Sequence, residues 1–227
     1  MRIAHIDYNF IYELSENDRG ILIIEDARTF RMIINQLKRS LVDREEIFIF
    51  SDNNKIVRAW EKIDLVTNPI DIVINSRKLV NKLYDKINEE INMSDLLIDN
   101  NLVCQNIEKL FLCMSDGFEL ELSYKEKIEV NDILKMLDIK VTEEYSDEIE
   151  KVVEYMHANR LLLGIEYFIF VNLNTFFNSY EIEKIYEFAE YHKINIFLVE
   201  STQPDSIEKY TQVKIIDKDN CEISLDM

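Results

Sequence analysis

The chain has 227 residues, 47% of them hydrophobic, and carries a formal net charge of −18. This composition supports a sizeable buried core, and no apolar run reaches the roughly 20 residues that a membrane-spanning helix needs. The start of the chain, MRIAHIDYNF, lacks the pattern of a secretory signal peptide, so we expect a cytoplasmic protein. The three cysteines show neither CxxC nor Cys/His spacing, which argues against a disulfide framework or a zinc site.

Positive charge is concentrated in one part of the sequence. Residues 27–86 contain 12 Lys and Arg against 8 Asp and Glu, whereas the remainder contains 14 against 36. A uniformly acidic surface would repel nucleic acid, but a confined basic region can still hold a polyanion. The alternative is chance clustering on solvated helix faces, and charge alone does not decide between the two.

The first third of the chain predicts a hairpin followed by strands and a helix. RIAHID and FIYELS alternate apolar and polar residues, and a turn at 17–20 leads into a buried strand, GILIIED. Residues 27–41 predict a helix with an apolar face at Phe30, Ile33, Ile34, Leu37 and Leu41. Two further strands are predicted at 46–52 and 63–68, before Pro69 disfavours helix continuation.

The middle of the chain is mostly helical. A helix capped by Ser76 reaches Asn92, and further helices are predicted at 94–114 and 131–137. A last helix, capped by Ser146, runs to about residue 162, where Gly164 can end it. Between these helices, FELELSY and IKVTEE alternate in the manner of strands.

The end of the chain returns to an α/β pattern. EYFIFVN predicts a strand, residues 179–192 a helix, NIFLVES a strand, and VKIIDKDNCEISL an edge hairpin that turns at 217–220. Alternating strands and helices favour a largely parallel, covered sheet. We therefore predict an α/β fold with a mostly parallel sheet in a discontinuous head domain, 1–69 and 164–227, and an inserted, mainly helical leg domain, 70–163.

The strands GILIIED and EYFIFVN are typical of an NTPase core, but a phosphate-binding loop is missing. Only three glycines occur, Gly20, Gly117 and Gly164, and no GxxxxGK[ST] can be written. The pattern predicts an NTPase-like head of degenerate P-loop type without enzymatic activity, in which the strand-end carboxylates Glu25, Asp26 and Glu200 are structural. The alternative is an active NTPase or metal-dependent nuclease that uses such carboxylates.

Basic residues on the first predicted helix and just beyond it form the candidate DNA-binding surface. A row of cations contacts phosphates without reading base edges, so we expect binding to duplex DNA without sequence preference and with steep salt dependence. A further alternative is an interaction scaffold whose basic faces pack against acidic neighbours. The candidate residues are Arg28, Arg31, Lys38, Arg39, Lys55 and Arg58.

Carboxylates near FELELSY could form a metal site if this segment turned back on the helix that follows it. Calcium accepts six to eight oxygen ligands without strict geometry, although no EF-hand spacing is present. A solvated acidic face is at least an equal alternative in a chain with 44 acidic residues. The residues concerned are Glu119, Glu121, Glu126, Glu129 and Asp132.

The sequence also resembles a known family. The segments GILIIEDARTFRMIINQL, IDLVTNPIDIVINSRKLVNKLYDKI and EYFIFVNLNTFFNSYEIEKIYEFAEYHKINIFLVES are similar, in this order, to the ring-forming, DNA-end-binding spacer-acquisition proteins of type II-A CRISPR loci. The resemblance implies a non-catalytic homotetrameric ring that binds ends of double-stranded DNA in a basic central hole. It also implies partnership with the CRISPR integrase proteins and the effector nuclease.

Calcium is the cofactor that this resemblance implies. The acidic segment of the family matches FELELSYKEKIEVNDILKML and assigns metal ligation to Glu119, Glu121, Glu126 and Asp132. Ser123 and Lys125 stand where the family pattern has acids. The loss of two carboxylates, one of them to a cation, would lower the calcium affinity or move the site.

Overall fold

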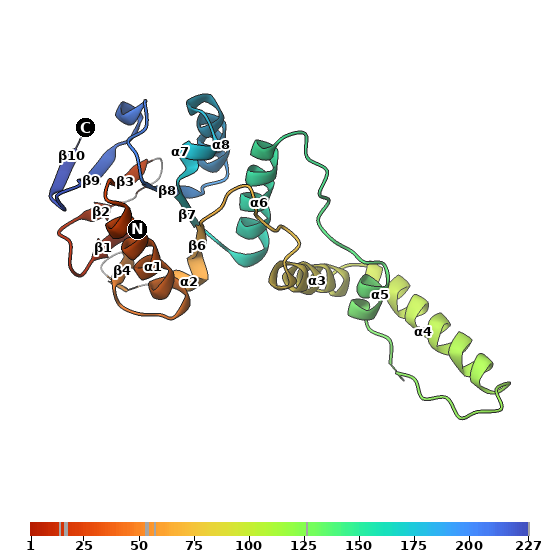
Figure 1. Cartoon of the computed structure of the whole chain (residues 1–227). Coiled ribbons are helices and arrows are strands. Elements are labelled where there is room, and N and C mark those ends of the chain that lie inside the picture. The colour runs from red at the N-terminus through yellow and green to blue at the C-terminus, as the bar shows by residue number, and fades with distance from the viewer. Residues whose placement is uncertain (14, 16–17, 53–54, 57, 126, 227) are drawn as a thin grey trace. The chain divides into compact units, whose positions relative to one another are not determined.

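A computed structural model describes residues 1–13, 15, 18–52, 55–56, 58–125 and 127–226, which form two compact units (Figure 1). The first unit comprises Met1–Ile74 and Glu143–Met227, and the second comprises Asn75–Thr142. The second predicted domain boundary, between residues 163 and 164, differs from the observed one because helix α6 (Glu148–Leu163) packs within the first unit. No described helix is long and apolar enough to cross a membrane.

A six-stranded sheet forms the centre of the first unit. Its strands β9, β3, β8, β7 and β6 are parallel, and β10 pairs antiparallel with β9 as the predicted edge hairpin. The mixed α/β architecture with a mostly parallel sheet is therefore confirmed. In spatial order the strands are β10 (Glu222–Asp226), β9 (Gln212–Ile216), β3 (Gly20–Ile24), β8 (Asn195–Glu200), β7 (Tyr167–Val171) and β6 (Ile63–Val66).

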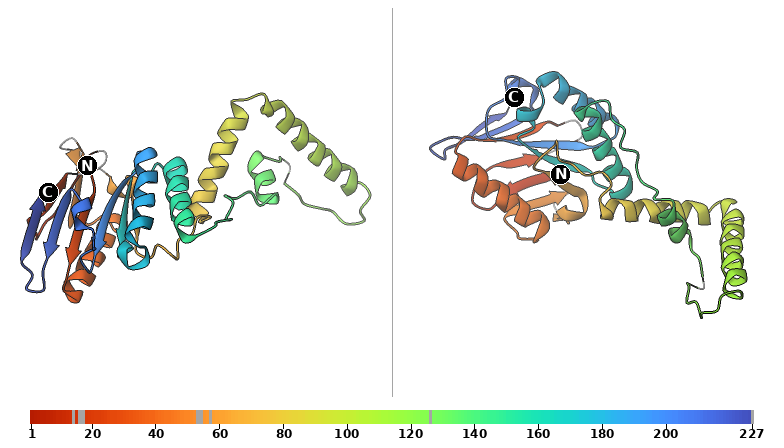
Figure 2. Two further views of the ribbon diagram at one scale, coloured as in Figure 1. Left: turned by 90° about the horizontal axis from the view of Figure 1, so that it is seen from above. Right: turned by 45° about the vertical axis from the view of Figure 1, so that its right-hand side comes forward.

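Strand β3 is buried on both faces, which explains its continuous apolar sequence. Ile21 and Ile23 face one hydrophobic core, which includes residues of α6, α7 (Leu173–Phe176) and α8 (Ser179–Tyr191). Leu22 and Ile24 face a second core, which includes residues of α1 (Ala27–Val42). The sheet thus lies between α6 and α8 on one side and α1 on the other (Figure 2).

A second sheet completes the core on the α1 side. It is antiparallel, with the order β2 (Ile11–Glu13), β1 (Arg2–His5), β4 (Phe48–Asp52) and β5 (Lys55–Ile56). The predicted N-terminal hairpin is confirmed by the β1–β2 pair. Phe48 and Phe50 of β4 are buried while Ile49 is exposed, so this strand contributes one face to the core. The short helix α2 (Ala59–Lys62) follows and was not predicted.

The second unit contains three helices: α3 (Arg77–Asn92), α4 (Leu96–Ser115) and α5 (Val130–Met136). The predicted cap of α3 is confirmed, since the Ser76 hydroxyl accepts a hydrogen bond from the Leu79 N–H at 3.4 Å. Tyr84, Val130 and Leu134 form a small buried cluster between α3 and α5. The Tyr84 hydroxyl donates a hydrogen bond to the Leu134 carbonyl at 3.3 Å.

Two predicted strands and one predicted cap are wrong. The described segments 118–124 and 139–144 form no strand, because alternation produces a strand only where a neighbouring strand accepts its hydrogen bonds. Asp147, not Ser146, caps α6 by accepting a hydrogen bond from the Glu150 N–H at 2.8 Å, while Ser146 bonds the Glu150 carboxylate. Gly164 ends α6 with a φ of 70°, as predicted. A short 3₁₀ helix, Ile207–Lys209, precedes β9.

Candidate functional site

In the NTPase-like head predicted from the sequence, a phosphate-binding loop would lie between β3 and α1. Only Glu25 and Asp26 separate the strand from the helix. The Asp26 carboxylate accepts a hydrogen bond from the Thr29 N–H at 2.7 Å, and this bond is the main cause of the lowered pKa of Asp26. A helix N-terminus attracts anions because its first N–H groups are unpaired. Here the protein's own carboxylate caps the N-terminus of α1.

Hydrogen bonds to the β9–β10 hairpin fix this turn. The Glu25 N–H donates to the Ile216 carbonyl at 2.9 Å. The Thr29 hydroxyl lies 2.8 Å from the side-chain oxygen of Asn220. Hydrogen bonds at Glu25 and Thr29 hold this two-residue turn on both sides. The turn is therefore too short and too constrained to surround a phosphate chain.

Three of the six predicted DNA-binding residues form an exposed stripe on α1. Arg28, Arg31 and Lys38 are exposed and repeat at i, i+3 and i+10, which places them on one face of the helix. Within the part of the chain that the structure describes, none of the three makes an ion pair. Their charges are therefore available to a polyanion.

Of the other three predicted DNA-binding residues, two already form ion pairs within the chain. Arg39 forms an ion pair with Glu45, and Arg58 pairs with Glu61 at 3.3 Å. Lys55 belongs to β5, and its side chain lies outside the described part of the structure.

The carboxylates predicted to bind calcium do not assemble into a site among the described residues. Glu119 and Glu121 are exposed in a segment without strand structure, and Glu126 lies outside the described residues. Asp132 accepts hydrogen bonds from the Lys125 ammonium at 2.5 Å and the Glu129 N–H at 2.9 Å, and the ammonium is the main cause of its lowered pKa. No described group of three or more His, Cys, Asp or Glu side chains is arranged to hold a metal ion. Calcium binding stays a prediction of the family resemblance.

Glu200 is a fully buried carboxylic acid at the carboxyl end of β8. Its Oε1 accepts a hydrogen bond from the Asn174 N–H at 3.2 Å. Its Oε2, the Asn174 Nδ2 and the Tyr186 hydroxyl are buried without a hydrogen-bond partner among the described residues. Burial raises the pKa of Glu200 to about 7. The sequence indicated a strand-end carboxylate here, but it carried no signal for this degree of burial.

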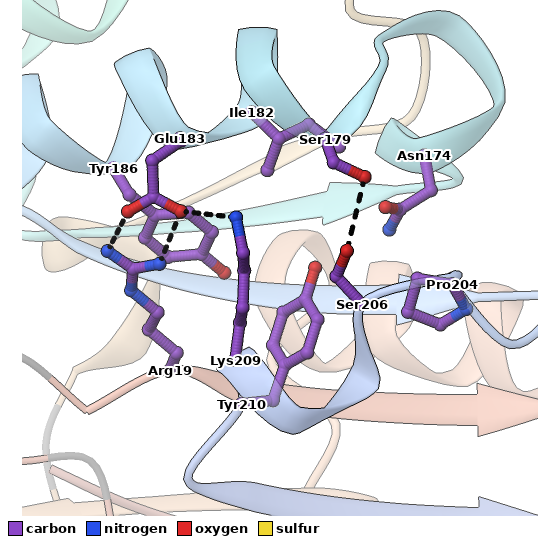
Figure 3. Close-up of a pocket in the computed structure, with 10 residues that line it drawn as sticks. All are labelled: Arg19, Asn174, Ser179, Ile182, Glu183, Tyr186, Pro204, Ser206, Lys209 and Tyr210. Carbon is purple, nitrogen blue, oxygen red and sulfur yellow. Dashed lines mark hydrogen bonds and ion pairs between the residues drawn. The ribbon is translucent and has the colours of Figure 1, made fainter.

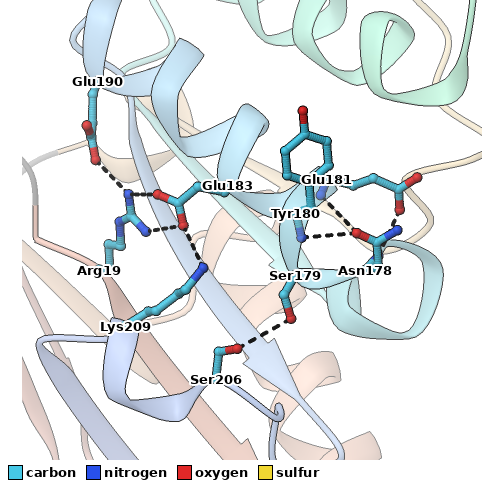
Figure 4. A network of polar contacts seen from close by, with 9 residues as sticks. All are labelled: Arg19, Asn178, Ser179, Tyr180, Glu181, Glu183, Glu190, Ser206 and Lys209. Carbon is cyan, nitrogen blue, oxygen red and sulfur yellow. Dashed lines mark hydrogen bonds and ion pairs between the residues drawn. The ribbon is translucent and has the colours of Figure 1, made fainter.

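A polar network beside this carboxylate was not predicted. The Arg19 guanidinium makes two hydrogen bonds to Glu183, at 2.7 and 3.0 Å, and one to Glu190 at 3.0 Å (Figure 4). It also lies over the Tyr186 ring, 4.3 Å from the ring centroid. The hydrogen bonds from Arg19 are the main cause that lowers the pKa of Glu183 to about 2. Sequence patterns carry no signal for a pair 164 residues apart.

The pocket that borders this network is very small. It is lined by Arg19, Tyr186 and Asn174 among others (Figure 3), and its volume is ≈ 10 Å³. Such a volume holds about one water molecule. The pocket is therefore too small for a nucleotide in this conformation.

The fold and these sites define an α/β protein with a mostly parallel central sheet, a two-residue β3–α1 turn capped by Asp26, and an exposed row of cations on its first helix. The family model described as CRISPR-associated protein (Cas_Csn2) matches residues 41–220, and the chain belongs to this family. The predicted resemblance to a type II-A CRISPR-associated family is thereby confirmed.

Two known relatives cover most of the chain. A CRISPR-associated protein Csn2 from Streptococcus agalactiae is 24% identical over 208 residues, which are 88% of this chain and 87% of the relative. Another Csn2, from Enterococcus faecalis, is 26% identical over 203 residues, 86% of this chain and 89% of the relative. A solved dimeric ATP-binding cassette with ADP and phosphate has a TM-score of 0.43 and 12% identity, over 96% of this chain and 89% of that one. A likeness at this level says nothing about activity.

Replacing Asp26 by alanine should destabilise the first unit, because the α1 N-terminus loses the acceptor for the Thr29 N–H. We expect the thermal unfolding midpoint to fall by about 2 to 4 °C, as for other lost helix caps. Asp26→Asn should retain most of the stability, since asparagine caps equally well. Glu25→Ala is the matched control, and an equal loss in this variant would contradict the capping role.

Glu200 should make stability fall as pH rises. Its pKa is raised to about 7 when folded, so between its unfolded value near 4.5 and pH 7 the folded state holds a proton that the unfolded state has lost. The free energy of unfolding should decrease by about 3 kcal/mol across this window and then level off. Glu200→Gln should remove this slope in denaturant titrations at pH 5, 6, 7 and 8. Glu187→Gln, at an exposed position, is the control and should keep the slope. If Glu200→Gln also kept the slope, Glu200 would not be its cause.

Proposed function

We propose that this protein is a non-catalytic adaptation component that forms a homotetrameric ring and binds ends of double-stranded DNA without sequence specificity. In this proposal the first unit is an NTPase-like head of degenerate P-loop type, and the second is an inserted helical leg. The CRISPR integrase proteins and the effector nuclease are its partners during spacer acquisition. The observation that carries the proposal is the unpaired cation row on α1 at Arg28, Arg31 and Lys38.

The geometry of this row suits a phosphate backbone. With a rise of about 1.5 Å per residue, Arg28 and Lys38 lie about 15 Å apart along the helix axis, a distance over which a duplex presents several phosphates. The row is held on a regular helix whose opposite face is anchored in the core by Ile33 and Leu37. Contacts of this kind position DNA without reading its bases.

The absence of catalysis is part of the proposal and is supported by the closed β3–α1 turn. Asp26 caps the helix, so an active NTPase would have to break this cap before a phosphate could enter. The competing function, a metal-dependent nuclease or NTPase, would need free carboxylates in a convergent set. Calcium enters as a cofactor only through the family resemblance, and no step of the proposed binding mechanism uses it.

Helix α4 supports self-association. It carries apolar residues around its circumference, and only Cys104 is buried. A helix of this kind is normally covered on every side. We therefore assign its cover to second copies of this chain. The exposed large apolar residues of α4 are Leu96, Ile98, Leu102, Val103, Leu110, Phe111, Leu112 and Met114.

Reversing two charges of the row tests the DNA-binding function. Arg28→Glu with Arg31→Glu should weaken binding of linear duplex and reduce the slope of log affinity against log salt by about 2 for each protomer that faces the DNA. Binding should be measured on linear and covalently closed DNA at two salt concentrations. A closed ring threads only onto ends, so circles should bind more weakly.

Lys184→Glu with Lys193→Glu is the matched control, because it changes the net charge equally at exposed positions in and after α8, which packs on the other side of the sheet from α1. Unchanged DNA binding in the α1 variant, with its fold intact, would favour an interaction scaffold. Phosphate release or DNA cleavage that disappears with Asp26→Asn would favour an enzyme.

Polar substitution on α4 should dissociate the oligomer. Leu102 and Phe111 are 56% and 48% exposed, so Leu102→Asp with Phe111→Glu removes apolar surface without opening a core cavity. Light scattering should show a lower mass than for the unaltered protein. Asn106→Asp adds charge to the same helix without removing apolar surface and should retain the mass. A monomeric unaltered protein would contradict the ring.

A further inference from the structure

The second unit contains a cavity that none of the roles described so far uses. Its volume is ≈ 310 Å³, and it is bounded by α3, α4 and the chain that leads into α5. Cavities of this size are typical of small-ligand sites. This cavity is distinguished by its lining, which includes five asparagines: Asn88, Asn92, Asn100, Asn101 and Asn131.

The asparagine carboxamides leave hydrogen-bonding capacity unused. The Oδ1 of Asn131 is buried and has no hydrogen-bond partner in the described part of the chain. The Asn92 Nδ2 donates to the Asn88 Oδ1 at 3.1 Å, which still leaves donors and acceptors on both side chains. A buried acceptor without a partner destabilises a fold unless a ligand or water satisfies it. The carboxamides that line the cavity thus have donors and acceptors to offer a bound molecule.

Charges of both signs lie at the cavity, and the Glu108 carboxylate accepts a hydrogen bond from the N–H of the lining residue Ile128 at 3.0 Å. Lys127 and Glu129 both line the cavity. The Glu129 carboxylate lies 3.6 Å from the Lys125 ammonium, which compensates its charge. Lys127 is exposed and makes no ion pair with any described residue, so one cation is left for a ligand.

Apolar side chains complete the lining. Leu97, Ile128 and Val130 can contact the face of a flat ring while the carboxamides bond its edge. An asparagine carboxamide offers a donor beside an acceptor, the pairing that adenine and other bases present at their edges. A nucleotide matches this lining. Its base can contact the apolar side chains and bond the carboxamides, and its phosphate can meet Lys127.

We propose that this cavity binds one unpaired nucleotide, with carboxamides on the base and Lys127 on the phosphate. The cavity is too small for a duplex and much larger than a metal ion needs. The nucleotide could be free or could stand at the unpaired end of a DNA strand, since the same chemistry recognises both. This site is separate from the α1 row and does not depend on the proposed duplex binding.

Calorimetric titration of the full chain, in buffer with a chelator, tests the proposal. The probes are the four deoxynucleoside monophosphates, their nucleosides, inorganic phosphate and a four-nucleotide single strand. We expect saturable binding of at least one monophosphate or of the single strand. Binding of both fits a site open to free nucleotides, whereas binding of the strand alone identifies the strand end as the source.

Two variants test the assigned contacts. Lys127→Gln should weaken monophosphate or strand binding about tenfold, the effect of one charge-assisted hydrogen bond, and leave nucleoside binding unchanged. Asn131→Leu removes the unpartnered acceptor and should weaken all base-containing probes by a similar factor. Lys109→Gln, an exposed lysine of the same unit outside the cavity, is the control.

The proposal is overturned if no base-containing probe binds, if inorganic phosphate binds as well as the nucleotides, or if Lys127→Gln binds like the control. Lys127 is exposed, so its substitution tests the site even if Asn131→Leu fails to fold. Loss of duplex binding in the α1 variant would leave nucleotide binding in place, which separates the two proposals.

Discussion

The contact between the Asp26 carboxylate and the N-terminus of α1 determines how the first unit can work. Because Asp26 follows β3 almost directly, α1 begins where the most deeply buried strand of the sheet ends. A phosphate-binding loop separates strand and helix by several residues, whose N–H groups surround the anion. Here the anion is a side chain of the protein itself, and the helix is tied rigidly to the core. This one contact caps α1 and holds its cation row on a fixed support.

Other groups that catalysis could use are likewise engaged within the fold. Glu200 is buried at the end of β8, and Arg19 is surrounded by two carboxylates and an aromatic ring. Asp132 caps α5 and bonds Lys125. Surface features that remain without a partner among the described residues include the cation row of α1 and the apolar circumference of α4. Both are suited to binding other macromolecules, since neither presents a nucleophile beside a base.

The elements predicted correctly from the sequence have local causes. The strands β3, β7 and β8 are continuous apolar runs, and α3 starts at a serine whose hydroxyl reaches the third N–H beyond it. Predictions failed where the outcome depends on distant partners. FELELSY alternates but has no neighbouring strand among the described residues. Strand β4 was predicted, but its pairing with β1 was not, because tertiary packing sets it. The α1 row could be predicted because its residues repeat with the period of a helix. The ion pairs of Arg39 and Arg58 could not, because they form only when the chain folds. The same holds for the asparagine-lined cavity.

In the proposed function, the acidity of the chain makes DNA binding depend on assembly. A single protomer offers three unpaired cations on α1 within a molecule of net charge −18, so one copy would hold DNA weakly and only at low salt. If four rows faced one duplex, about 12 phosphate contacts would give a salt slope near −11, which is typical of tight binders. The remaining acidic surface would then repel DNA everywhere except in the shared cavity, and so restrict binding to that position. In the proposed function, self-association through α4 and the basic row of α1 are therefore two requirements of one mechanism, because each would be ineffective without the other.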